Sequence, residues 1–201
     1  FLVSYKFDEA KLAVFRYGAK EFPIFVLLIY AYSNAMTPKF ANKDNLQSAL
    51  LELKQEGKKL MSWIYPSSIL LILTSKFLYP IVFNPNFAES AVVFNVYLMI
   101  IVIRFLFTRP IVIGFKETKV IFWSSFFETI LNVTLSLILI NVWGIVGVAV
   151  ATLISYIFES LYLIIYLKRK HNILPNSYLS VKQYLFWTSL LIIAFVFSFY
   201  I

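Results

Sequence analysis

Apolar residues in this chain fall into six long blocks that are separated by short polar segments. The blocks cover residues 12–36, 60–78, 91–114, 120–142, 145–167 and 184–201. An α-helix rises about 1.5 Å per residue, so about 20 apolar residues cross the hydrocarbon core of a bilayer. The pattern therefore predicts six transmembrane helices. We expect an all-α, polytopic membrane helix bundle that forms one domain over residues 1–201.

The segment 39–59 differs from these blocks because it mixes apolar and charged residues with helical spacing. Its apolar positions share one helical face and its charged positions lie on the other: Leu46, Ala49, Leu50 and Leu53 against Lys54, Glu56, Lys58 and Lys59. This arrangement is typical of an amphipathic helix that lies on the membrane surface. We expect it to be a separate element on the cytoplasmic side.

The composition supports an integral membrane protein. Hydrophobic residues make up 61% of the chain and charged residues 14%, whereas soluble domains contain about 25% charged residues. The net charge of +8 does not indicate nucleic-acid binding, because the basic residues lie between apolar blocks. The chain has no cysteine, which excludes disulfides and thiol chemistry.

The basic residues also predict an orientation. Segments 39–59, 116–119 and 168–182 are rich in Lys and Arg, whereas the intervening segments 79–90 and 141–144 contain neither. The positive-inside rule places the three basic segments in the cytoplasm. His171 lies in the last of them, where we expect it to be in water. The N-terminal side of the first block falls outside, although it carries four cations, Lys6 and Lys11 before the block and Arg16 and Lys20 at its start.

Four charged residues interrupt the third to fifth apolar blocks, namely Arg104, Arg109, Glu128 and Glu159. A charge near the bilayer centre costs roughly 2.5–3.5 kcal/mol, so these side chains must face protein or water. Measured along the helices from the 116–119 turn, Arg104 and Glu128 lie at similar depths, about 17 Å away. We therefore predict that they pair. Asn132, one turn from Glu128, completes a predicted polar cluster with Glu159.

This cluster has two interpretations. It is either a structural ion pair that fixes helix register, or the polar wall of a cavity that meets an anionic substrate or a coupling cation. Arg109 precedes Pro110 and is expected to extend to the cytoplasmic headgroups. Arg16 and Lys20, at the start of the first block, are either phosphate contacts or interfacial anchors.

No catalytic or metal-binding pattern is present in the sequence. It contains no glycine-rich phosphate loop, no His/Cys cluster and no nucleophile with an adjacent base. We therefore expect neither an enzyme nor a resident metal or cofactor.

Several motifs resemble the second half of an oligosaccharide flippase of the O-antigen type, in the multidrug/oligosaccharidyl-lipid/polysaccharide exporter superfamily. These motifs are Phe15-Arg16-Tyr17-Gly18-Ala19 before Pro23, Asn34-Ala35-Met36-Thr37-Pro38, Tyr97 with Arg104, the segment 113–119, Asn132 and the segment 141–152. The most typical is the pattern Gly-x-x-Gly-x-Ala-x-Ala-Thr, which ends at Thr152.

The resemblance implies a transporter with two lobes around a central cavity. This chain would supply the second lobe, with about the eighth to thirteenth helices, and the first lobe would be absent. The implied activity is transfer of a polyprenyl-diphosphate-linked oligosaccharide across the bacterial inner membrane by alternating access, for O-antigen and lipopolysaccharide synthesis. Arg16, Lys20 and Arg104 would line the path, with Glu128 partly offsetting their charge. Coupling to Na⁺ or H⁺ is left open.

The implied partners are the lipid-linked oligosaccharide, membrane lipids and other membrane proteins of polysaccharide assembly. Three alternatives fit the same residues. They are a lipid II flippase, a multidrug or cation exporter of the same superfamily, and a scaffold subunit of an envelope glycan assembly complex.

Overall fold

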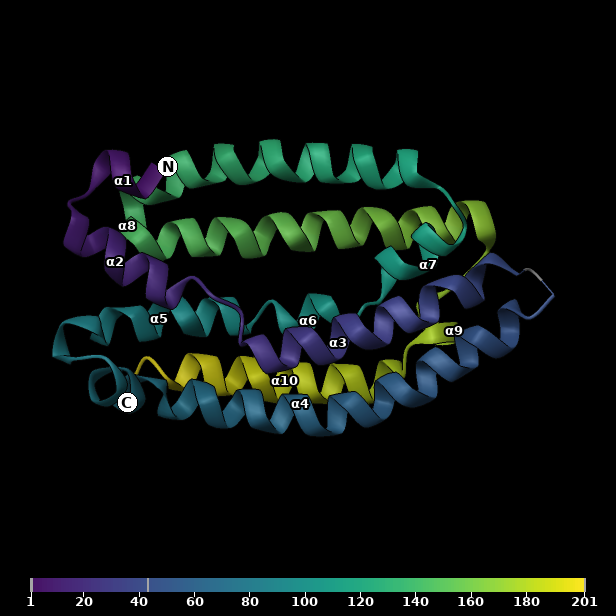
Figure 1. The fold of residues 1–201 in the computed structure, drawn as a ribbon, viewed down its shortest axis with the longest axis horizontal. Helices are drawn as coiled ribbons and strands as arrows, with labels where there is room; N and C mark the ends of the chain where they lie inside the picture. Colours follow the sequence, from purple (N-terminus) through teal and green to yellow (C-terminus); the bar gives the residue numbers. More distant parts are fainter. Residues whose placement is uncertain (1, 43, 201) are drawn as a thin grey trace.

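Helices form almost the whole of the computed structural model, which describes residues 2–42 and 44–200. In chain order they are α1 (Leu2–Lys6), α2 (Glu9–Gly18), α3 (Pro23–Met36), η1 (Thr37–Ala41), α4 (Leu46–Val82), η2 (Pro85–Phe87), α5 (Ala88–Leu98), α6 (Ile101–Arg104), α7 (Thr108–Gly114), α8 (Thr118–His171), α9 (Pro175–Tyr178) and α10 (Val181–Phe197). The long helices lie roughly along one axis (Figure 1). The expected all-α membrane bundle is confirmed.

Three helical segments are long and apolar enough to cross a membrane within the described residues, namely Leu46–Val82, Pro85–Arg104 and Thr118–His171. The last of these, α8, contains two passes because its backbone is non-helical at Trp143 and Gly144. The two halves of α8 lie side by side in Figure 1. Together they cover the residues of the predicted spans 120–142 and 145–167. The shorter α10 corresponds to the predicted last span.

Two glycines make the reversal within α8 possible. Gly144 has φ +58° and ψ −136°, a conformation that side chains disfavour. A Cβ atom on Gly147 would lie 2.2 Å from the carbonyl oxygen of Leu139 in the other half of α8. The Gly-x-x-Gly motif therefore supplies both the turn and the close approach of the two passes.

The first predicted span is not continuous. Helix α2 ends at Gly18 and α3 begins at Pro23, so residues 19–22 form a break. Proline suits the first turn of a helix, where its missing N–H would have no intrahelical partner, whereas inside a helix it removes a backbone hydrogen bond. At the end of α2, a Cβ on Gly18 would lie 2.5 Å from the carbonyl oxygen of Ser90.

Two further boundaries differ from the prediction. The third span is divided into α5, α6 and α7, and Phe107 before α7 has the left-handed angles φ 49° and ψ 22°. Conversely, the predicted surface helix and second span form one helix, α4, of 37 residues. At about 1.5 Å per residue α4 is about 55 Å long, which exceeds a hydrocarbon core of about 30 Å. The amphipathic part is thus an extension of a spanning helix.

The three basic segments meet at one end of the bundle, at the right in Figure 1. There the ammonium of Lys54 donates to the carbonyl oxygen of Asn176 at 2.6 Å, and Lys170 pairs with Glu117 at 2.6 Å. At the opposite end, Lys11 of α2 forms an ion pair with Glu89. The three segments predicted to share one side of the membrane therefore lie at the same end of the bundle.

Glu117 holds the turn between α7 and α8 to the end of α8. Burial raises the pKa of this carboxyl group, but hydrogen bonds from Lys170, Tyr166 and His171 lower it to about 2. The His171 ring stacks on Phe115 with 4.3 Å between centroids, so it is not simply in water as predicted. Because the pKa is depressed, this stabilisation is complete above about pH 4.5 and is lost as the pH falls towards 2.

The shared basic end gives a direct test of topology. Because the chain has no cysteine, the variants Gln55→Cys and Asn86→Cys each carry one thiol. A membrane-impermeant maleimide added to intact cells should label position 86 and leave position 55 unlabelled until the membrane is opened. The reverse pattern would show that the bundle is inserted the other way.

The close packing in α8 predicts that Gly147→Ala destabilises the protein. Its Cβ overlaps the Leu139 carbonyl group, so the two passes must separate, at a cost of about 1–3 kcal/mol. Val142→Ala, at an exposed position beside the turn, is the matched control. Thermal unfolding in detergent should show a lower midpoint for the glycine variant alone, and equal midpoints would contradict the close approach.

Candidate functional site

Arg104, at the end of α6, is held by three side chains. Its Nε and Nη2 atoms donate to the Glu21 carboxylate at 3.0 and 2.6 Å. Its guanidinium carbon lies 5.2 Å from the ring centroids of both Tyr30 and Tyr156. A bidentate carboxylate together with two aromatic rings fixes both the position and the plane of the guanidinium group.

The predicted pairing of Arg104 with Glu128 is therefore wrong. The depth estimate compared only helices that are neighbours in the chain. Glu21 comes from a segment 83 residues away, and the break before α3 places it beside Arg104. The sequence feature that could have indicated this partner is Glu21 itself, a carboxylate two residues before Pro23 near the start of an apolar block.

Arg109, in the first turn of α7, forms the second ion pair. Its Nε and Nη2 atoms donate to Glu159 at 3.2 and 2.6 Å, and Nη2 also donates to Ser125. Glu159 accepts further hydrogen bonds from Ser124 and Ser125, and its side chain is only 7% exposed. Arg109 thus turns inward to a buried carboxylate, and the expectation that it extends to the headgroups is wrong.

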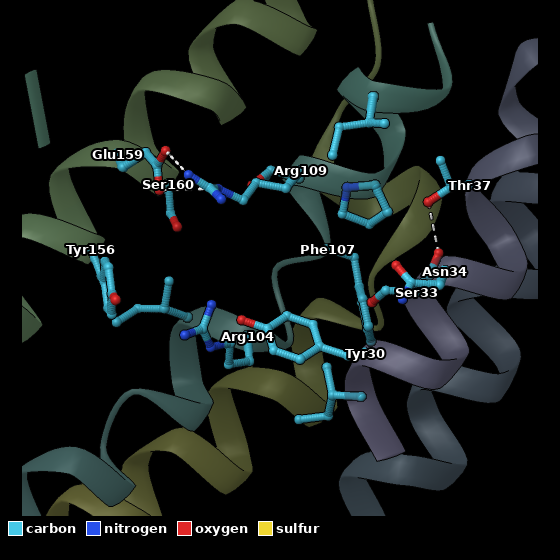
Figure 2. A pocket seen from close by; sticks show the side chains of 15 residues that line it. Tyr30, Ser33, Asn34, Thr37, Arg104, Phe107, Arg109, Tyr156, Glu159 and Ser160 are labelled. Atoms are coloured by element: carbon cyan, nitrogen blue, oxygen red, sulfur yellow. Dashed lines mark hydrogen bonds and ion pairs between the residues drawn. The ribbon is translucent and has the colours of Figure 1, made fainter. Parts of the chain in front are cut away.

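The two arginines border one cavity of about 170 Å³. Figure 2 shows both guanidinium groups beside the open space, with Tyr156, Glu159 and Ser160 of α8 on one side. Polar side chains of α3 and η1 close the other side. These are Tyr30, Ser33, Asn34 and Thr37. The cavity therefore combines charged and polar side chains with apolar ones such as Ile103 and Phe107.

The remaining predicted residues lie around this cavity or away from it. Glu128 is close enough to interact with Arg109 and Glu159, but it does not line the cavity. The Asn132 side chain accepts a hydrogen bond from Ser136 and donates one to Thr152 at 3.2 Å. The bond to Thr152 joins the two halves of α8.

The three cations that we predicted on one path are separated in the structure. Arg104 lines the cavity, Lys20 lines a different pocket, and Arg16 is exposed on α2. Arg109 joins Arg104 instead, and sequence reasoning missed this role. We expected Arg109 at the membrane interface because it precedes Pro110. Pro110 instead lies in the first turn of α7, so Arg109 is also part of this helix.

The arrangement can bind an oxyanion. An arginine side chain has five N–H donors, and each guanidinium here uses only Nε and Nη2 for its contacts within the described residues. Neither Nη1 group donates to a protein acceptor in that part of the chain. Because each arginine is already neutralised by a carboxylate, the cavity can also be empty without an unpaired charge in the membrane.

Helices long enough to span a membrane, with arginine–carboxylate ion pairs beside a cavity, are features of membrane transport proteins. Comparison with known families makes the class specific: residues 2–201 match the family described as Lipid II flippase MurJ. The chain belongs to this family. No curated protein and no solved structure matches it. The resemblance to flippases is thereby confirmed at the level of a flippase family, whereas the O-antigen type is not.

A double-mutant cycle tests the partner of Arg104. The variants Glu21→Gln and Arg104→Gln should each lower the free energy of unfolding, because each leaves a largely buried charge without its partner. Their coupling energy should be about 1–3 kcal/mol. The same cycle with Glu128→Gln serves as control and should give a coupling near zero. A larger coupling energy of Arg104 with Glu128 than with Glu21 would contradict the observed ion pair and support the pairing predicted from the sequence.

Proposed function

We propose that this chain forms the second lobe of a flippase that moves a polyprenyl-diphosphate-linked saccharide across the bacterial inner membrane, and that the substrate is lipid II. The family match over residues 2–201 carries the proposal. The cavity beside Arg104 and Arg109 supports it, because a diphosphate offers several charged oxygen acceptors to the free guanidinium donors.

The geometry suggests how the lobe handles such a substrate. Arg104 is fixed between two tyrosine rings, so its remaining donors are already oriented when the diphosphate arrives. Its carboxylate partner, Glu21, competes with the diphosphate for the same charge. This competition limits the affinity and favours release, which a transporter requires as much as binding.

The cavity has room for only part of the substrate. At about 170 Å³ it is smaller than a typical ligand pocket of about 300–1,000 Å³. We propose that the first lobe of the whole protein supplies the opposite wall and that one lobe rocks against the other during transport. Arg104 and Arg109 would then serve as contacts that the second lobe offers to the diphosphate.

An O-antigen-type carrier is the second candidate substrate, because it bears the same diphosphate and motifs 113–119 and 141–152 resemble flippases of that type. The family description favours lipid II. An exporter of cationic drugs is less compatible with the site, since both arginines would repel such a substrate. The family match to a flippase likewise gives no support to a scaffold role.

The test uses the intact protein as the sole source of the activity in its host. Arg104→Ala should abolish transport, so that lipid II accumulates in the cytoplasmic leaflet. Arg104→Lys should retain part of the activity because the charge persists but the bidentate geometry is lost. Arg169→Ala, at an exposed position in the basic end, is the matched control and should be active.

Three outcomes are distinguishable, provided that membrane abundance is measured in parallel. Accumulation of lipid II supports the proposal. Accumulation of an O-antigen carrier instead would retain the mechanism and change the substrate. Unaltered transport in Arg104→Ala and Arg109→Ala at normal abundance would show that the two ion pairs are only structural.

A further inference from the structure

A second cavity, of about 320 Å³, lies at the break between α2 and α3, against the last turns of α4. Its walls are mostly apolar and aromatic side chains. The main ones are Tyr17, Phe22, Leu71, Leu78, Val82 and Phe94. Phe94, from α5, is buried, whereas Val82 is 65% exposed. The cavity is thus a slot with a covered floor and an open rim, which we call the break slot.

The break slot extends along one face of α4. Leu71, Ser75, Leu78 and Val82 line it at successive turns of the helix, over a length of about 16 Å. The hydroxyl group of Ser75 does not offer a hydrogen bond to the slot, because it donates to the carbonyl oxygen of Ile72. A narrow apolar slot of this length fits an extended hydrocarbon chain better than a polar solute.

One cation lines the break slot. Lys20 is exposed, and its ammonium lies 5.5 Å from the centroid of the Tyr17 ring. Within the described residues it makes no ion pair, because the adjacent carboxylate, Glu21, is bound to Arg104. Glu21 also lines the slot, but its carboxylate accepts two hydrogen bonds from Arg104 and is neutralised there, which leaves Lys20 without a partner. The apolar slot therefore has a single positive charge without a counter-ion.

The aromatic side chains around Lys20 indicate its depth in the membrane. Tyr17 packs on Phe83 with 4.9 Å between ring centroids, and Tyr79 packs on Phe83 at 5.3 Å. The Tyr79 hydroxyl group donates to the carbonyl oxygen of Tyr17, which ties α4 to α2. Clustered tyrosines at a helix end are typical of the headgroup level of a bilayer. From there the slot follows α4 towards the middle of the bundle.

We propose that the break slot binds an anionic phospholipid of the surrounding membrane, with one acyl chain along α4 and the phosphate on Lys20. Charge complementarity selects the lipid: one ammonium group without a counter-ion matches one phosphodiester. The proposal is independent of the transported substrate, because Lys20 and Arg104 line different cavities. The bound lipid fills the gap that the α2–α3 break leaves in an otherwise packed wall.

Photo-crosslinking of lipids in the intact protein tests this site. p-Benzoylphenylalanine in place of Val82 reports on the rim of the slot, and the same group in place of Phe77 reports on ordinary boundary lipid. Phe77 is a matched control because it is 59% exposed on the same helix but does not line the slot. The membranes contain phosphatidylglycerol and phosphatidylethanolamine, and mass spectrometry identifies the adducts.

We expect phosphatidylglycerol to be enriched about fivefold over its bulk fraction at position 82, the ratio that one lysine near an anionic surface supports. At position 77 the adducts should follow the bulk composition. Lys20→Gln should abolish the enrichment and Lys20→Arg should retain it. Arg16→Gln, which removes an exposed cation of α2 outside the slot, should leave it unchanged. Equal thermal unfolding midpoints will show that the variants are folded.

Three results would overturn the proposal. Adducts of bulk composition at position 82 would mean that the rim meets boundary lipid only. Equal loss of enrichment in the Lys20 and Arg16 variants would mean diffuse surface attraction without a site. A polyprenyl diphosphate as the main adduct would assign the slot to the transported substrate. None of these results bears on the activity of Arg104 variants, so the two proposals fail separately.

Discussion

A charge inside a membrane protein must be neutralised where it lies, and this requirement explains most of the central architecture. Arg104 and Arg109 lie on apolar segments, and each meets a carboxylate in bidentate geometry. Leaving Arg104, whose side chain is only 17% exposed, without a partner would cost several kcal/mol. The helices are arranged so that neither is left unpaired.

The breaks in the helices provide this arrangement. The interruption between α2 and α3 places Glu21 beside Arg104, and the left-handed residue Phe107 separates α6 from α7, so that the two arginines lie on different helices. Left-handed angles at a residue other than glycine cost of order 1–3 kcal/mol, and they occur where the surroundings impose them. Phe107 is almost fully buried and packs on Phe105 and Tyr32, which holds it in place.

The same break divides two chemical environments. On one side, Arg104 and Arg109 line the cavity between α3, α7 and α8. On the other side, Lys20 and Glu21 line the apolar slot, and Glu21 reaches Arg104 from there. A continuous helix would separate adjacent side chains by only about 100° around its axis. The irregular backbone between α2 and α3 allows the Glu21 carboxylate to reach Arg104 while Lys20 remains exposed at the slot.

The sequence by itself determined the fold class, the spans that became α8 and α10, the shared end of the basic segments and the presence of charges that must face inward. These features depend on hydrophobicity, length and the spacing of Lys and Arg, which are local properties. The reversal at Gly144 was also predictable from the sequence, because a short turn with glycines separates two apolar blocks.

Only the tertiary structure decided which charges meet. The run from Leu98 to Phe107 contains neither glycine nor proline, so nothing local predicted the breaks around α6. The pairing of Arg104 with Glu21 joins residues 83 positions apart, and their distance depends on how α3 packs against the rest of the bundle. Hydrophobic patterns fix the depth of a side chain but not its azimuth around the helix or its distant neighbours. For this reason the residues of the site could be selected from the sequence, while their partners could not.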